Sequence, residues 1–197
     1  MEIDQEIRRR FIVHEGDTLP NKARNCGRDT LAQFMGEMGF KTGAEIWVLK
    51  GDYSQVLCHY IPGLKLKMID PWIPFGRNYG TKARIEGCME RAKVKTQGFD
   101  VEFIRKKSLE AVVDIPNGSL DFVYIDEMHE FDPVMMDLIQ WSPKVRKGGI
   151  VAGHDYSNIY FQFGVILAVN AYTYAHNIHH WYVTDKDFHP SFFWVKS

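Results

Sequence analysis

The sequence has few cysteines and no long apolar run. Its three cysteines, Cys26, Cys58 and Cys88, are widely spaced and form no Cys-X-X-Cys pair, which argues against a structural zinc site or a redox motif. An odd cysteine count also fits a reducing compartment better than a disulfide framework. No apolar segment approaches the roughly 20 residues that cross a bilayer, and the charged start MEIDQEIRRRF is unlike a signal peptide. We therefore expect a cytoplasmic protein with no membrane partner.

An excess of positive charge is also absent. Lysine and arginine total 24 against 25 aspartates and glutamates, which gives a formal net charge of -1 and no support for a nucleic-acid partner. The fingerprint Gly-X-Gly-X-X-Gly is missing as well, which argues against a nicotinamide cofactor. What the chain does have is 197 residues that are 45% hydrophobic, enough for one ordinary domain with a full core.

Alternating apolar and polar segments predict alternating strands and helices. Strands are expected at 44–51, 64–72, 100–108, 120–125 and 149–153, followed by an aromatic-rich antiparallel pair at 179–185 and 190–197. Helices are expected at 25–39, 52–63, 81–98, 108–116 and 154–177, with one more between 126 and 148. We predict one doubly wound α/β domain with a mostly parallel sheet of about seven strands, over residues 21–197, after a helix and loop at 1–20.

The stretch 120–156 is the most informative part of the chain. It reads strand, loop, helix, Gly-Gly turn and strand, and its two strands are followed by Asp126 and by the pair His154 and Asp155. His129 lies three residues beyond Asp126. Ligands of open α/β sheets bind outside the carboxyl ends of the strands. These four side chains are therefore a candidate reaction centre.

The acids and imidazoles of this centre leave several roles open. Asp126, His154 and Asp155 suit Mg²⁺, Mn²⁺ or another divalent ion, and one of them could instead act as general base toward a hydroxyl. The alternative is that Asp155 caps a following helix and His154 belongs to the edge of the core. For His129, the roles of base, metal ligand and helix-start residue all stay open.

Two strand ends upstream suit a nucleotide. Asp70 follows the strand at 64–69, where an acid can hold both hydroxyls of a ribose, although an Asp-Pro turn explains it too. Glu45 and Gly51 suit a nucleotide loop, because glycine lets the backbone approach a ligand at a helix start. Trp47 conflicts with this role, since its indole must either fill the cofactor space or turn into the core.

Two polar residues have simpler explanations. Ser108 opens the helix expected at 108–116, so capping alone accounts for it, although the same place would also face an adenine. Asp137, inside the helix that follows His129, is expected to be solvated or related to capping.

With these residues in view, the chain resembles the class I S-adenosylmethionine-dependent methyltransferases. The resemblance runs from about Pro20 to the C-terminus through the segments GAEIWVLKGDYS, KMIDPW, KKSLEAV, YIDEMHEFDPVMMDL and GGIVAGHDY. It implies a seven-stranded sheet with a final antiparallel strand and S-adenosylmethionine above the first strands. It also implies methionine-side contacts for Glu45 and the loop 47–54 with Trp47, Gly51 and Ser54, the ribose for Asp70, and the adenine side for Ser108. The catalytic edge that it implies consists of Asp126, His129, His154 and Asp155. Of these, Asp126, His154 and Asp155 are the candidate metal ligands, and Asp126 is also a candidate for cofactor contact.

Two residues depart from the family pattern. Trp47 stands where the pattern EIGV has glycine, and Glu127 where YIDG has glycine. The main hypothesis is therefore O-methylation of a small-molecule or sugar hydroxyl, and the alternative is a methyltransferase fold with impaired cofactor binding that serves as a non-catalytic module. A metal-dependent hydrolase or a nicotinamide enzyme is a third possibility. Residues 1–20 and 71–80 are candidates for covering the site, and neither the acceptor nor the oligomeric state can be read from the sequence.

Overall fold

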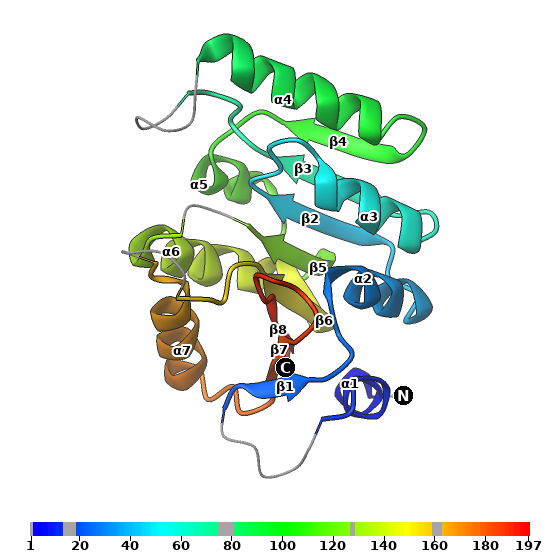
Figure 1. Ribbon diagram of the computed structural model, residues 1–197, viewed down its shortest axis with the longest axis vertical. Helices are drawn as coiled ribbons and strands as arrows, with labels where there is room; N and C mark the ends of the chain where they lie inside the picture. The colour runs from blue at the N-terminus through cyan, green and yellow to red at the C-terminus, as the bar shows by residue number, and fades with distance from the viewer. Residues whose placement is uncertain (1, 14–18, 75–80, 127–128, 159–162) are drawn as a thin grey trace.

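The computed structural model describes residues 2–13, 19–74, 81–126, 129–158 and 163–197. Within them, eight strands form one sheet between two layers of helices (Figure 1). The strands are β1 Asn21–Ala23, β2 Thr42–Ile46, β3 Lys65–Ile69, β4 Asp100–Ile104, β5 Leu120–Ile125, β6 Val145–Gly153, β7 Trp181–Thr184 and β8 Phe192–Val195. The helices are α1 Ile3–Arg10, α2 Arg28–Glu37, α3 Asp52–Tyr60, α4 Lys82–Lys95, α5 Ser108–Ala111, α6 Phe131–Trp141 and α7 Val165–Ala175, with the short 3-10 turns η1 Val112–Asp114 and η2 Ser142–Lys144. None of these described helices is both long and apolar enough to cross a membrane.

The sheet has the order β1-β7-β8-β6-β5-β2-β3-β4. β8 runs antiparallel to β6 and β7, and all other neighbours are parallel. The predicted doubly wound α/β fold with a C-terminal antiparallel pair is therefore confirmed. The prediction of about seven strands missed β1, because three residues are too short to show an alternating pattern and their partner β7 lies far along the chain.

The central strands end at the same level, and this places the candidate site. Ile46 of β2 is in register with Ile69 of β3 and with Ile125 of β5, and Ile125 is in register with Gly153 of β6. The residues that follow these four strands therefore emerge side by side along one edge. They are Trp47, Asp70, Asp126 and His154.

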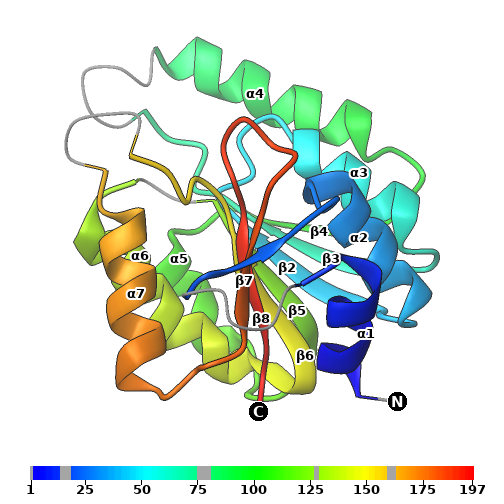
Figure 2. The same cartoon turned by 60° about the horizontal axis from the view of Figure 1, so that its bottom comes forward.

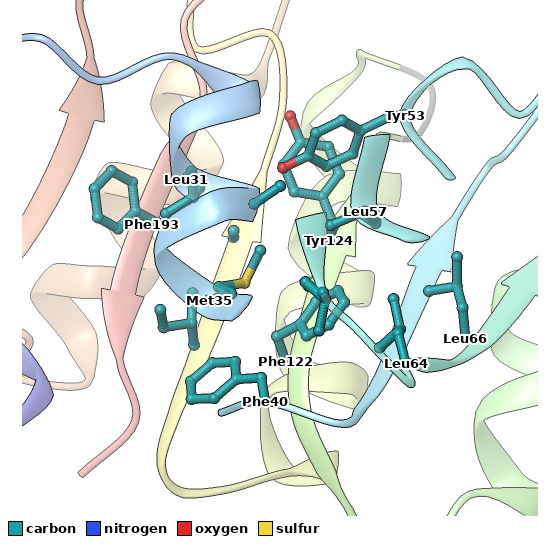
Figure 3. Close-up of a cluster of buried hydrophobic side chains, with 14 of the residues drawn as sticks. Leu31, Met35, Phe40, Tyr53, Leu57, Leu64, Leu66, Phe122, Tyr124 and Phe193 are labelled. Carbon is teal, nitrogen blue, oxygen red and sulfur yellow. The ribbon is translucent and has the colours of Figure 1, made fainter. Parts of the chain in front are cut away.

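Each face of the sheet has its own hydrophobic core. The first core lies under α1 to α4, where Leu31 and Met35 of α2 recur at helical spacing and pack near Phe122 and Tyr124 of β5 (Figure 3). The second core lies under α5, α6 and α7, with Trp141 fully buried in it. Both faces of the central strands are thus covered, which is why those strands read as continuous apolar runs.

The long helix predicted at 154–177 is wrong. The helix α7 begins only at Val165, and Asp155 has a left-handed backbone with φ of 58°. L-residues with side chains rarely adopt this conformation, and it cannot continue a right-handed helix. Asp155 is therefore not the cap of a following helix, and its carboxylate is used elsewhere.

Candidate active site

A cavity of about 220 Å³ opens at the carboxyl ends of β2, β3 and β5. Its walls come from the loops after these strands, from the start of α2 and from α4. Small-molecule sites usually measure about 300–1,000 Å³, so this cavity is small for a nucleoside ligand. The lining residues are Arg28, Glu45, Trp47, Val48, Leu49, Lys50, Asp52, Tyr53, Asp70, Ile73, Ile85, Asp126 and His129.

Glu45 is the innermost carboxyl of the cavity. It points from β2 into the first core, is 2% exposed, and accepts a hydrogen bond from the hydroxyl of Ser54 on α3. Burial raises the pKa of Glu45 to about 8, and the charge of Asp126 adds to the rise, while the Ser54 hydrogen bond opposes it. Burial therefore favours the protonated form of Glu45, and Ser54 acts by holding it.

The loop after β2 turns sharply, and three of its residues have a left-handed backbone. They are Trp47 (φ 68°), Leu49 (φ 51°) and Gly51 (φ 70°). At Gly51 an added Cβ would lie 3.0 Å from the Cα and Cβ of Ala92, so glycine here permits close packing against α4. Trp47 both lines the cavity and packs against the second core. Its indole therefore takes up part of both spaces that the sequence left as alternatives.

Asp70 is held firmly by the protein. Its Oδ2 accepts the backbone N–H of Leu49 at 2.9 Å, and its Oδ1 accepts that of Trp72 at 2.6 Å. Burial raises the pKa of Asp70, although these two hydrogen bonds and Arg105 oppose the rise. Each carboxylate oxygen keeps a second acceptor position, so Asp70 fixes the loops after β2 and β3 while it faces the cavity.

Asp155 is the centre of a cluster of imidazoles. His129 Nε2 lies 2.6 Å from its Oδ2, and His154 Nδ1 and His189 Nδ1 lie 3.2 Å and 3.4 Å from its Oδ1. His129 also stacks on the ring of Phe163, with centroids 4.3 Å apart. The carboxylate thus lies close to three rings, and His129, which it binds at hydrogen-bond distance, is the one that reaches the cavity.

The cluster shifts the protonation of its members. Burial lowers the pKa of His154, but hydrogen bonds and charges from Asp126 and Asp155 outweigh it and raise the pKa to about 9. For Asp155, burial acts to raise the pKa, yet the hydrogen bonds from His129 and His154 hold it well below its usual range. At neutral pH the site therefore contains an imidazolium between carboxylates.

The predicted metal ligands are close enough to share an ion. Three possible ligand atoms, one from each of Asp126, His154 and Asp155, lie within 4.8 Å of one another. Two carboxylate oxygens and an imidazole nitrogen suit a divalent cation such as Mn²⁺ or Mg²⁺, so the residues fit the group. His154 would have to lose its proton to act as a ligand.

Two predictions about α5 and α6 need correction. Ser108 is the first residue of α5 and Lys107 occupies the cap position. The Ser108 hydroxyl donates to Asp137 and accepts from Trp141 Nε1 at 2.7 Å. Asp137 was expected to be solvated or related to capping, yet it is only 1% exposed and is bound by the Ser108 hydroxyl. This buried triad joins α5 to α6, because neither an indole N–H nor a carboxylate is stable in a core without a partner.

The structure brings some predicted residues to the cavity and leaves others away from it. Glu45, Trp47, Asp70, Asp126 and His129 line it, whereas Gly51, Ser54, Ser108, His154 and Asp155 are not among its lining residues. Glu127 and part of the loop 71–80 lie outside the described residues.

Sequence reasoning missed Arg28 and His189. The loop between β7 and β8, which carries His189, rises at the same end of the sheet as the loop after β2 (Figure 2), and its Asp187 accepts the N–H of Arg28 at 2.9 Å. A signal did exist for Arg28, because a cation in the first turn of a helix opposes the macrodipole. For His189, a histidine in a hairpin loop, there was no comparable signal.

Comparisons with known proteins agree with this geometry. Residues 44–156, more than half of the chain, match the family described as a methyltransferase domain. Among solved structures, an O-methyltransferase from Bacillus cereus in complex with SAH is 14% identical with a TM-score of 0.58, over 100% of this chain and 91% of that one. The O-methyltransferase TomG from Streptomyces achromogenes, in complex with SAM and involved in tomaymycin synthesis, is 14% identical with a TM-score of 0.57 and the same coverage, 100% and 91%. A protein from Corynebacterium glutamicum is 14% identical with a TM-score of 0.62, over 98% of this chain and 88% of that one. At these identities the structures show a shared fold. None of the curated proteins compared with the chain matches it.

Proposed function

Because the chain belongs to the family of methyltransferase domains, as its motifs predicted, we propose that it binds S-adenosylmethionine in the cavity and transfers the methyl group to an oxygen. The acceptor that we propose is a hydroxyl of a small molecule or a sugar. The near-neutral net charge of -1 favours such an acceptor over a nucleic acid.

The observation that carries this proposal is the contact between His129, which lines the cavity, and Asp155 behind it. Methyl transfer is a displacement in which the acceptor oxygen attacks the sulfonium methyl carbon, the carbon–sulfur bond breaks, and S-adenosylhomocysteine leaves. The enzyme has to align the reactants and take up the hydroxyl proton. His129 is oriented by the 2.6 Å contact with Asp155 and faces the cavity, so it is the base that the geometry favours.

A divalent ion held by Asp126, His154 and Asp155 would lower the pKa of an acceptor hydroxyl bound to it. We propose this assistance on the strength of the donor atoms, which all lie within 4.8 Å of one another. The protein's own contribution is then to bind and orient: Asp155 fixes His129, and Asp70 fixes the loops that form the cavity wall.

A second candidate function is supported by Trp47. The indole occupies a position with φ of 68° and lines a cavity of about 220 Å³, below the usual size of a ligand site. A scaffold with impaired cofactor binding, acting as a non-catalytic module, would account for a bulky residue at this place.

Calorimetric titration with S-adenosylmethionine and S-adenosylhomocysteine, with and without Mg²⁺, tests the proposal. Micromolar binding by the unaltered protein is the expected result. The variant Trp47→Gly separates the two candidates, because it enlarges the cavity and places glycine at a left-handed position. If the unaltered protein does not bind and Trp47→Gly does, the non-catalytic alternative is established. If neither protein binds, the cofactor is rejected altogether.

A further inference from the structure

Arg28 is a cation in the cavity that the proposed chemistry does not use. It is the first residue of α2, and its side chain, 33% exposed, lines the cavity beside Glu45 and Asp126. Within the described residues no side chain or backbone group accepts a hydrogen bond from the guanidinium. Its nearest charged group is the Oδ2 of Asp126, at 3.9 Å. As far as the described residues go, the five N–H donors of this side chain therefore remain available to a ligand.

The protein nevertheless holds this guanidinium in place. Its central carbon lies 5.3 Å from the ring centroid of Tyr53, which is buried and donates from its hydroxyl to the backbone oxygen of Arg28. Asp187, from the loop between β7 and β8, accepts the backbone N–H of Arg28 at 2.9 Å. An arginine whose backbone is held by two neighbouring elements, and whose guanidinium lies over a ring and is partly desolvated, suits an anion with two oxygens.

We propose that Arg28 binds the carboxylate of the amino-acid part of S-adenosylmethionine. This inference rests on the proposed function, which supplies the ligand. The placement supports it in two ways. Arg28 lines the same cavity as the buried Glu45, the carboxyl that the family resemblance assigns to the methionine side. Asp126, 3.9 Å from the guanidinium, offers the opposite charge to the ammonium group that every α-amino acid carries next to its carboxylate.

The test compares two ligands and three variants by calorimetry. The ligands are S-adenosylhomocysteine and its decarboxylated analogue, which differ only in the carboxylate. Arg28→Met removes the charge at similar length, and Arg24→Met is the matched control, since Arg24 is an exposed arginine four residues earlier. Lys50→Met examines the other cation that lines the cavity. Circular dichroism and thermal unfolding check that each variant folds.

Arg28→Met should weaken S-adenosylhomocysteine binding by about 10- to 100-fold, the value of hydrogen bonds to a charged group. It should leave binding of the decarboxylated analogue unchanged, and Arg24→Met should change neither. If Arg28→Met does not fold, Arg28→Lys keeps the charge without the planar fork and should still weaken the carboxylate ligand selectively.

Other outcomes overturn the proposal in distinguishable ways. Equal loss for both ligands would make Arg28 a structural residue, and a selective loss in Lys50→Met alone would assign the carboxylate to Lys50. Unchanged cofactor binding in Arg28→Met with a raised KM for an anionic acceptor would show that the anion comes from the acceptor. Failure of the unaltered protein to bind either ligand would instead reject the proposed function itself.

Discussion

Strand β5 has Asp121 near its amino end and is followed directly by Asp126, and the two aspartates are used differently. Near the amino end, Asp121 accepts hydrogen bonds from the backbone N–H groups of Lys41 (2.7 Å) and Thr42 (2.8 Å), the Thr42 hydroxyl (3.0 Å) and Arg146 Nε (2.6 Å). Partial burial acts to raise the pKa of Asp121, but these hydrogen bonds outweigh it and lower the pKa. Oδ2 of Asp121 thus accepts three hydrogen bonds and Oδ1 accepts one, all from the protein.

At the carboxyl end, Asp126 has looser contacts. Its charged neighbours are Arg28 at 3.9 Å and His154 at 3.5 Å, and its side chain is 24% exposed at the cavity. The same residue type therefore holds the fold together near one end of β5 and keeps acceptor capacity for a ligand just beyond the other end. The difference lies in how many donors the neighbouring segments direct at each carboxylate.

The largest expected effect comes from removing the uncommitted carboxylate. Asp126→Asn should lower kcat/KM by about 100-fold or more, because acid–base and charge-stabilising groups at a reaction centre contribute about that much. Stability should change by less than about 1 kcal/mol, since its contacts are longer than hydrogen bonds. The measurement is release of S-adenosylhomocysteine with an acceptor found by screening hydroxyl compounds, together with urea unfolding. Full activity in Asp126→Asn would mean that the looser contacts of Asp126, compared with those of Asp121, do not mark it as a residue of the active site.

The reverse pattern is expected at the other end of the strand. Asp121→Ala should lower the free energy of unfolding by about 2–3 kcal/mol, because it leaves backbone N–H groups of Lys41 and Thr42 and the Arg146 charge without their partner. Affinity for S-adenosylhomocysteine should stay the same under conditions where the variant is folded. Urea unfolding and calorimetry measure the two quantities. A loss of affinity without a loss of stability would contradict the structural role of Asp121.

The sequence predicted the fold better than the site. Strand ends and apolar periodicity located the central strands and the edge to which Asp70, Asp126 and His154 belong, because backbone hydrogen bonding in a parallel sheet fixes where strands end. Helix α7 was extended too far toward its start, since an apolar, aromatic segment does not reveal the left-handed backbone at Asp155.

The hydrogen-bond and charge partners of each site residue could not be predicted from the sequence. The hydrogen bond from Ser54 to Glu45 and the contact of His189 with Asp155 join segments whose approach depends on tertiary packing. Ser108 illustrates the same limit, because its position at a helix start explained it locally while its hydroxyl is bound to Asp137 and Trp141 of another helix.

A third carboxyl, that of Glu45, should make the stability of the protein depend on pH. Burial raises the pKa of Glu45 from 4.5 to about 8, so between these values the unfolded chain releases a proton that the folded protein keeps. Stability must then fall as pH rises, by up to about 1.4 kcal/mol per pH unit. Glu45→Gln lacks this titrating group, so its free energy of unfolding should rise relative to that of the unaltered protein between pH 5 and 8. Urea unfolding at pH 5, 6, 7 and 8 checks this, and parallel profiles would show that Glu45 is ionised in the folded state.

The smallest effect is expected for an aspartate on the surface just before β5. Asp114 pairs with Lys106 at 2.6 Å, but the two side chains are 62% and 48% exposed, so water and salt screen the pair and replace it at little cost. Asp114→Asn should leave the unfolding midpoint and the affinity for S-adenosylhomocysteine unchanged within error. Thermal unfolding at low and high salt measures the first, and calorimetry the second. Asp114 has a single partner, whereas Asp121 has several. A clear drop in the unfolding midpoint of Asp114→Asn at both salt concentrations would therefore mean that the number of donors does not decide how much a carboxylate stabilises this fold.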